Sequence, residues 1–197
     1  DVVYPAETPF TNMHGNVSFE AQWTSSEYKL TLDLDNGSIE DNKTEYVYAY
    51  ALPLEIKDPE RAGYSFVEWE VSSTPAGTDT WIKGEKFKYG TTDNSVTIPA
   101  NRMGDVTLKA VWEPNTYTVS FDANGGNGVT PFTYKITGSF TIPSTTKKGY
   151  TFTGWSVSEK DTDGCNWNKE IYNGGETVSG LYGNVTLRAN WEKTNYV

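Results

Sequence analysis

The chain has 197 residues, with 16 Lys and Arg against 26 Asp and Glu, so its formal net charge at pH 7 is −10. This charge disfavours a nucleic-acid partner, because phosphate binding needs clustered Lys and Arg and here the basic residues are scattered. A single cysteine, Cys165, excludes an intrachain disulfide, and no apolar run approaches the ~20 residues needed to span a membrane.

The first predicted element is a strand that recurs twice later in the chain. Its sequence GNVSFEAQW at residues 15–23 returns as GDVTLKAVW at 104–112 and as GNVTLRANW at 183–191. In each copy the apolar residues alternate, which places them on one face of an extended strand. They are Val17, Phe19, Ala21 and Trp23, then Val106, Leu108, Ala110 and Trp112, then Val185, Leu187, Ala189 and Trp191. We therefore predict three half-buried strands in a tandem array.

A second strand begins five residues after the first two of these Trp residues. It reads YKLTLDLDNG at residues 28–37 and YTVSFDANGG at 117–126. Both copies end in an Asn-Gly pair, which is a β-hairpin turn signal. With 18 Gly, 13 Tyr and 7 Trp and almost no helical periodicity, the chain is predicted to be mainly β with little helix.

A third signature follows as GYSFVEW at residues 63–69 and GYTFTGW at 149–155. Strict alternation places Tyr64 and Phe66 on one face of this strand and Trp69 on the other. We therefore expect a strand with bulky side chains on both faces.

An aromatic residue recurs twelve positions further on, as Trp81 and Trp167. We interpret most Trp and Tyr residues as core, because a small module needs the large area that rings bury. Recurrence at one place favours the core, although a repeated binding site would recur too. Trp81 and Trp167 are kept as the candidate binding residues.

The repeats divide the chain into four parts. They are the second half of an incomplete repeat (1–23), module 1 (28–112), module 2 (117–191), and the start of a next repeat or a tail (192–197). The first part rests on a gapless alignment of residues 4–23 with 172–191. Two explanations stay open for it: the chain is a slice of an array, or the folded module is permuted relative to this frame and these residues pack into a neighbour. The linkers 24–27 and 113–116 are short, and Pro114 limits swing between modules.

A Ser/His/Asp or Cys/His catalytic set needs a histidine as its base. The only histidine, His14, lies in a turn of the incomplete unit, and Cys165 lies between turn formers with no second His to activate it. We expect no catalytic residue and no enzymatic activity.

Two carboxylate pairs have the spacing of calcium loops, namely Asp33 with Asp35 and Asp161 with Asp163. Neither pair is followed by the full ligand series, and turns in which an Asp side chain binds the backbone explain both more simply. The glycine run at 122–128 lacks the Lys-Ser/Thr ending of a phosphate loop. We therefore expect no metal and no cofactor.

The order YTVSFDANGG, GYTFTGW, GNVTLRANW resembles the Listeria/Bacteroides repeat, or internalin B-repeat, family of bacterial surface proteins. The resemblance covers 117–191 closely, 28–112 with more drift, and the second half of a unit at 4–23. It implies β-grasp-like modules of about four strands, repeated as a stalk, with no catalytic residues to carry over. Module 1 departs from it in its turn, DLDNGS, and in the extra residues 88–103, where unit-specific contacts are expected.

The resemblance implies a non-catalytic stalk or spacer of an adhesion protein, extracellular and on the bacterial cell surface or cell wall. The alternative is an adhesin module that binds a host glycan or an extracellular protein. The expected partners are therefore neighbouring repeats of the same chain and, in the alternative, that glycan or protein.

Overall fold

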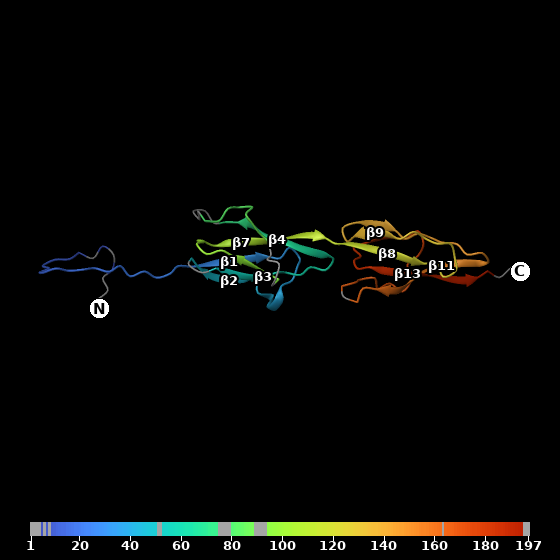
Figure 1. The fold of residues 1–197 in the computed structure, drawn as a ribbon, viewed down its shortest axis with the longest axis horizontal. Helices are drawn as coiled ribbons and strands as arrows, with labels where there is room; N and C mark the ends of the chain where they lie inside the picture. Colours follow the sequence, from blue (N-terminus) through green and yellow to red (C-terminus); the bar gives the residue numbers. More distant parts are fainter. Residues whose placement is uncertain are drawn as a thin grey trace.

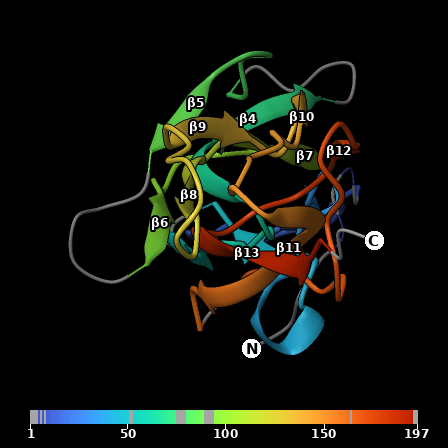
Figure 2. The same ribbon diagram turned by 90° about the vertical axis from the view of Figure 1, so that its right-hand side faces the viewer.

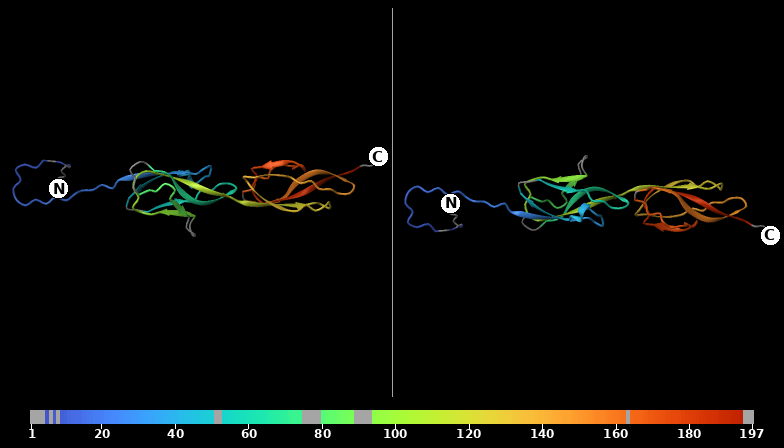
Figure 3. Two further views of the ribbon diagram at one scale, coloured as in Figure 1. Left: turned by 90° about the horizontal axis from the view of Figure 1, so that it is seen from above. Right: turned by 90° about the horizontal axis from the view of Figure 1, so that it is seen from below.

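The computed structural model describes residues 5, 7, 9–50, 53–74, 80–88, 94–162 and 164–194. Two groups of strands, module 1 and module 2, follow one another along the long axis (Figure 1). Views from above and below show the same succession (Figure 3). The protein is mainly β, and among the described residues the only helical element is one 3-10 turn, η1 (Glu40–Asn42).

Module 1 contains a five-stranded sheet in the order β2-β1-β7-β4-β5 and a separate two-stranded sheet of β3 and β6. Its strands are β1 (Glu27–Asp33), β2 (Glu45–Ala49), β3 (Leu54–Lys57), β4 (Tyr64–Ser73), β5 (Lys86–Lys88), β6 (Ser95–Ile98) and β7 (Val106–Pro114). The first strand, β1, and the last, β7, are neighbours and run parallel, with Leu32 opposite Leu108. The chain therefore enters the sheet at one end and leaves it at the other.

Module 2 repeats this plan with a four-stranded sheet in the order β11-β13-β8-β9 and a two-stranded sheet of β10 and β12. Its strands are β8 (Thr116–Asp122), β9 (Phe132–Lys135), β10 (Ser139–Thr141), β11 (Tyr150–Lys160), β12 (Thr177–Ser179) and β13 (Val185–Lys193). The counterpart of β5 is reduced to one bridge between Trp155 and Tyr172. The fold is thus β-grasp-like, with four or five strands in each main sheet and two more beside it.

Each module has its own core, built largely from the alternating positions of the sequence. Trp69 and Trp155 are fully buried at equivalent places on β4 and β11. Each packs against a Phe of the same strand, with ring centroids 5.3 Å apart in both modules. Figure 2 shows the strands of the two modules in a view along the long axis.

The prediction that Phe66 and Trp69 face opposite sides of their strand is wrong. Phe66 pairs with Trp112 on β7 but Glu68 pairs with the next residue, Val111, so Val67 is an extra residue in a β-bulge. One extra residue reverses the alternation beyond it. Phe66 and Trp69 therefore share the core face, and β11 has the same bulge between its Phe and its Gly.

The predicted half-buried strand at residues 15–23 does not form. These residues have no regular structure, and the exposed fractions of Phe19 and Trp23 are 58% and 89%. In the two modules the equivalent strands, β7 and β13, each lie between two other strands of the sheet. The described residues before β1 include no counterpart of those two neighbours, and the ring of Phe19 contacts that of Phe10 instead, with centroids 4.9 Å apart. The assignment of residues 1–23 to an incomplete repeat stays a prediction.

A turn forms at the end of β1, but its central residues are Asp35 and Asn36 and not the Asn-Gly pair of the predicted hairpin signal. Asp35 and Asn36 both have positive φ, 46° and 67°, and the Gly37 amide donates to the carbonyl of Leu34 at 2.9 Å. Both features are those of a type I′ turn. A longer connection containing η1 then leads to β2, so the turn starts the reversal of the chain without joining the two strands directly.

Candidate functional site: a groove beside Trp112 on module 1

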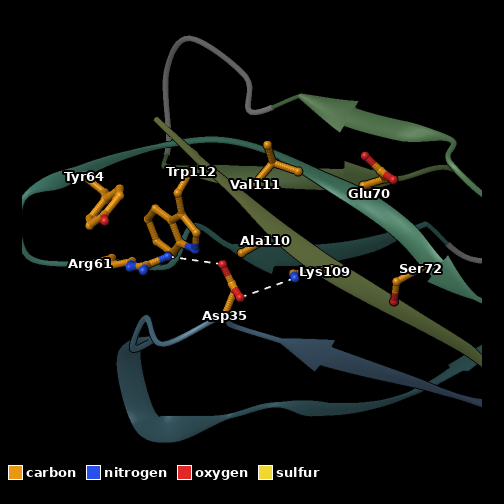
Figure 4. A pocket seen from close by; sticks show the side chains of 9 residues that line it. All are labelled: Asp35, Arg61, Tyr64, Glu70, Ser72, Lys109, Ala110, Val111 and Trp112. Carbon is orange, nitrogen blue, oxygen red and sulfur yellow. Dashed lines mark hydrogen bonds and ion pairs between the residues drawn. The ribbon is translucent and has the colours of Figure 1, made fainter. Parts of the chain in front are cut away.

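A groove of about 350 Å³ opens on module 1 beside β4 and β7 (Figure 4). Its lining consists of Asp35, Arg61, Tyr64, Glu70, Ser72, Lys109, Ala110, Val111 and Trp112. The rings of Tyr64 and Trp112 are half-buried, so part of each faces the groove. Apolar walls with a few convergent polar groups are typical of small-ligand sites.

Asp35 is the electrostatic centre of the groove. One carboxylate oxygen lies 3.2 Å from Arg61 Nη1 and the other lies 3.3 Å from Lys109 Nζ (Figure 4). The turn holds the backbone of Asp35 in place, because the Asp35 amide donates to Asp33 Oδ1 at 3.0 Å. The Asp35 and Lys109 side chains are 37% and 46% exposed. Such pairs are weak in water, so a polar ligand could replace them at small cost.

Trp112 lies between the groove and the turn after β1. Its indole nitrogen donates to the Leu34 carbonyl at 3.1 Å. The ring lies over the turn so closely that a Cβ on Gly37 would come within 2.6 Å of it. The Arg61 guanidinium lies 4.0 Å from the ring centre of Tyr64 and 6.0 Å from that of Trp112, within the range of cation–π attraction.

Module 2 repeats the frame of this groove but changes its charge. Trp191 donates to the carbonyl of its turn at 3.1 Å, and Lys147 Nζ lies 4.5 Å from the ring centre of Tyr150. Asn124 replaces the carboxylate of Asp35 and accepts from Arg188 at 2.9 Å. The frame is therefore structural and recurs, while the central carboxylate is specific to module 1.

The candidate binding residues Trp81 and Trp167 lie in the two cores, where 4% and 1% of their surfaces are exposed. Each indole nitrogen donates to a tyrosine hydroxyl, that of Tyr48 at 2.9 Å and that of Tyr134 at 2.7 Å. Burial raises the pKa of Tyr134 to about 12, because the phenolate would be poorly solvated there. Neither Trp joins the groove. As binding residues they stay a prediction for which the structure offers no exposed ring face.

The other titratable candidates are dispersed. His14 is exposed in the N-terminal segment, and Cys165 is half-buried against Gly183. Asp161 Oδ2 accepts from the backbone and side-chain nitrogens of Asn184 at 2.8 and 3.0 Å, and Asp163 lies outside the described residues. In the described part of the chain, no three His, Cys, Asp or Glu side chains gather as a metal would require.

Sequence reasoning missed Arg61, Lys109 and the role of Trp112 in the groove. One signal was available: a basic residue stands two positions before the Gly-Tyr pair in both RAGY and KKGY. Its meaning depends on the pairing of β4 with β7 and on the turn after β1, which bring residues far apart in the sequence together.

In the part of the chain that the structure describes, no helix is long and apolar enough to span a membrane.

The sequence profile of the Listeria-Bacteroides repeat domain matches residues 28–111 and 117–190. The chain belongs to the Listeria-Bacteroides repeat family. These two matches account for most of the sequence, and each contains the turn and the bulged strand described above and ends one residue before the closing Trp.

The curated proteins that are similar to this member of the family include three from bacteria. Two are from Evansella cellulosilytica, "Putative membrane protein" and "Putative Gly-rich membrane protein", 27% and 30% identical over 92% of this chain and covering 23% and 18% of those proteins. The third is internalin H of Listeria monocytogenes, 31% identical over 70% of this chain and 21% of that protein. The chain thus spans about a fifth of the length of these relatives. No solved structure matches it.

Proposed function

We propose that this chain is a non-catalytic spacer segment of a bacterial cell-surface protein, which holds an adhesive part of that protein away from the cell wall. Membership in the Listeria-Bacteroides repeat family and the similarity to internalin H support a surface protein. The observation that carries the spacer role is the junction between the two modules.

Only one residue, Asn115, separates the end of β7 from the start of β8. Its amide donates to the Gly63 carbonyl at 3.0 Å, and its side-chain oxygen accepts from Ser65 Oγ at 2.6 Å. Its side-chain nitrogen reaches the Tyr117 hydroxyl of module 2 at 3.3 Å. The linker predicted at residues 113–116 is therefore mostly strand, and a connection this short with Pro114 before it restricts rotation.

A distance measurement between the modules tests the spacer role. Exposed Thr97 on β6 and Thr133 on β9 are replaced by Cys in a Cys165→Ala background and carry spin labels. We expect a narrow distribution of label distances in the chain, and a broad one after a Gly-Ser-Gly-Ser insertion following Asn115. Equally broad distributions for both proteins would contradict a stiff spacer.

A second candidate function is glycan binding in the groove of module 1. The half-exposed rings of Tyr64 and Trp112 beside an exchangeable Arg–Asp–Lys set favour it, because sugars stack on ring faces and bond to such polar groups. The matching frame of module 2 has no central carboxylate, so binding is expected on module 1 alone.

Tryptophan fluorescence during titration with a broad glycan panel tests this second candidate. We compare the chain with Arg61→Ala, which removes the groove guanidinium, and with Lys147→Ala, the matched change in module 2. Saturable binding lost in Arg61→Ala but kept in Lys147→Ala is expected. No saturable signal from any glycan would exclude the candidate and leave the spacer role.

A further inference from the structure

The junction between the modules has two complementary halves. On module 1, Gly63 is buried, and a Cβ at this position would come within 2.8 Å of Ile136 Cδ1 and 3.3 Å of Tyr182 Cβ. On module 2, Ile136 and Tyr182 are both half-buried against it. A glycine corner on one module thus fits between two apolar side chains of the next.

Each half has an equivalent at the opposite end of the other module. Tyr48 and Tyr134 occupy the same place, because each hydroxyl accepts from the recurring Trp and donates to the carbonyl of the Gly before the last strand. Counting from these fixed points, Tyr50 corresponds to Ile136 and Met103 corresponds to Tyr182.

The glycine corner recurs in the same way. Gly149 has φ of 79° against 81° for Gly63. Its carbonyl accepts the amide of Thr194 at 3.0 Å, as that of Gly63 accepts the amide of Asn115 at 3.0 Å. A hydroxyl on the strand also meets the junction residue in both modules.

At the outer ends these surfaces are uncovered. A Cβ on Gly149 would meet nothing within 4 Å, whereas Gly63 is enclosed. Tyr50 and Met103 are 44% and 40% exposed. Two large exposed apolar side chains at the end of a module gain free energy by being covered.

The spacing in the sequence fits a repeat of the same contact. Tyr117 lies five positions after Trp112 at the occupied junction, and Tyr28 lies five positions after Trp23 ahead of module 1. A module ending at the position of Trp23 would therefore reach module 1 over the same length of chain.

We propose that Tyr50 and Met103 form the receiving face for the glycine corner of a further module of this family, joined ahead of module 1. The contact is head to tail, so each module uses one face to receive its predecessor and the opposite corner to enter its successor. This goes beyond the spacer function, which needs a stiff junction between the two modules described but no docking elsewhere.

A fusion protein tests the proposal. Residues 1–194 are followed directly by residues 27–194 of a second copy, which restores the five-residue spacing from Trp191 to the second Tyr28. Met103 of the first copy is replaced by Leu, so that ¹³C-methyl methionine labelling reports only Met13 and the second Met103. Met13 is exposed in the N-terminal segment and serves as the internal control.

We expect the methyl signal of the second Met103 to shift and to lose relaxation enhancement from a dissolved paramagnetic probe, relative to Met103 in the unfused chain. Met13 should stay unchanged. Tyr50→Asp in the second copy should return the signal to its unfused position, and Ile82→Asp, a matched change at an exposed residue, should not.

A Met103 signal with the unfused shift and full relaxation enhancement would overturn the proposal, and so would protection that survives Tyr50→Asp. Either result leaves the label distances across Asn115 unaffected, so failure of this docking and failure of the spacer role are separate outcomes.

Discussion

Replacing Tyr134 with Phe removes one oxygen atom from the core of module 2 and breaks two buried hydrogen bonds. The hydroxyl accepts from Trp167 Nε1 at 2.7 Å and donates to the Gly183 carbonyl at 2.6 Å. The variant leaves both partners buried without a bond, at roughly 1–3 kcal/mol for each unsatisfied group. We expect the free energy of unfolding of module 2 to fall by about 2–6 kcal/mol, which for a module of this size lowers Tm by at least about 8 °C.

The assay is denaturant unfolding followed by tryptophan fluorescence, with calorimetry to separate the two modules. Tyr150→Phe is the matched control, because the Tyr150 side chain is 41% exposed and losing its hydroxyl should cost less than about 0.5 kcal/mol. Adding Trp167→Phe to Tyr134→Phe removes the orphaned donor, so the two changes together should cost less than the sum of the single changes. A destabilisation by Tyr134→Phe no larger than the control would refute the assignment of this bond as a core element.

Three further outcomes are expected. Burial raises the pKa of Tyr134 from 10.0 to about 12, so as pH rises the unfolded chain loses this phenol proton before the folded chain does. The contribution of the neutral Tyr134 to stability is therefore complete below pH 10 and lost by pH 12. Denaturant unfolding followed by circular dichroism at several pH values should show the free energy of unfolding falling by about 1.4 kcal/mol per pH unit in this range. Gly37→Ala places a methyl 2.6 Å from the Trp112 ring and should destabilise module 1 by about 1–3 kcal/mol in urea, and an unchanged midpoint would contradict the close packing. Leu187→Ala, in the core, should cost about 2–5 kcal/mol, whereas Phe19→Ala at the equivalent repeat position should change the thermal midpoint little, because it is exposed.

The alternating apolar residues predict β7 and β13 and the burial of their inward faces, because alternate residues of a strand point to the same face of the sheet. The turn after β1 was only partly readable: its central residues, Asp35 and Asn36, lie one position before the Asn-Gly pair, and β2 does not follow it directly. The alternating pattern of apolar residues failed to predict a strand at residues 15–23. Alternation states which face of a strand is apolar, but whether the strand forms depends on neighbours that the local sequence does not contain.

The bulge and the groove show a different limit. Val67 has no property that marks it as an extra residue in β4, because the bulge is defined by pairing with β7. The groove likewise brings Asp35, Arg61 and Lys109 together from three separate segments, and their spacing in the sequence carries no sign of that meeting. Recurrence of a basic residue before Gly-Tyr marks the frame, but only the fold shows that it lies over the rings of Tyr64 and Trp112.

The strand order also bears on the proposed spacer role, because it determines how a module would carry tension. In each module the first and last strands are parallel neighbours, β1 beside β7 and β8 beside β13. A pull along the molecule therefore acts on opposite ends of two strands that are bonded to each other, and it loads their evenly spaced hydrogen bonds together instead of opening them one at a time. If the last strand ran antiparallel to the first, the chain would leave each module at the end where it entered. The tension would then peel the pair apart from that end, and successive modules could not continue along one line. The parallel pairing thus makes the chain leave each module at the end opposite its entry, and it also makes the module resist a pull in that direction. Asn115 connects β7 to β8, so a pull on module 1 passes through it to module 2.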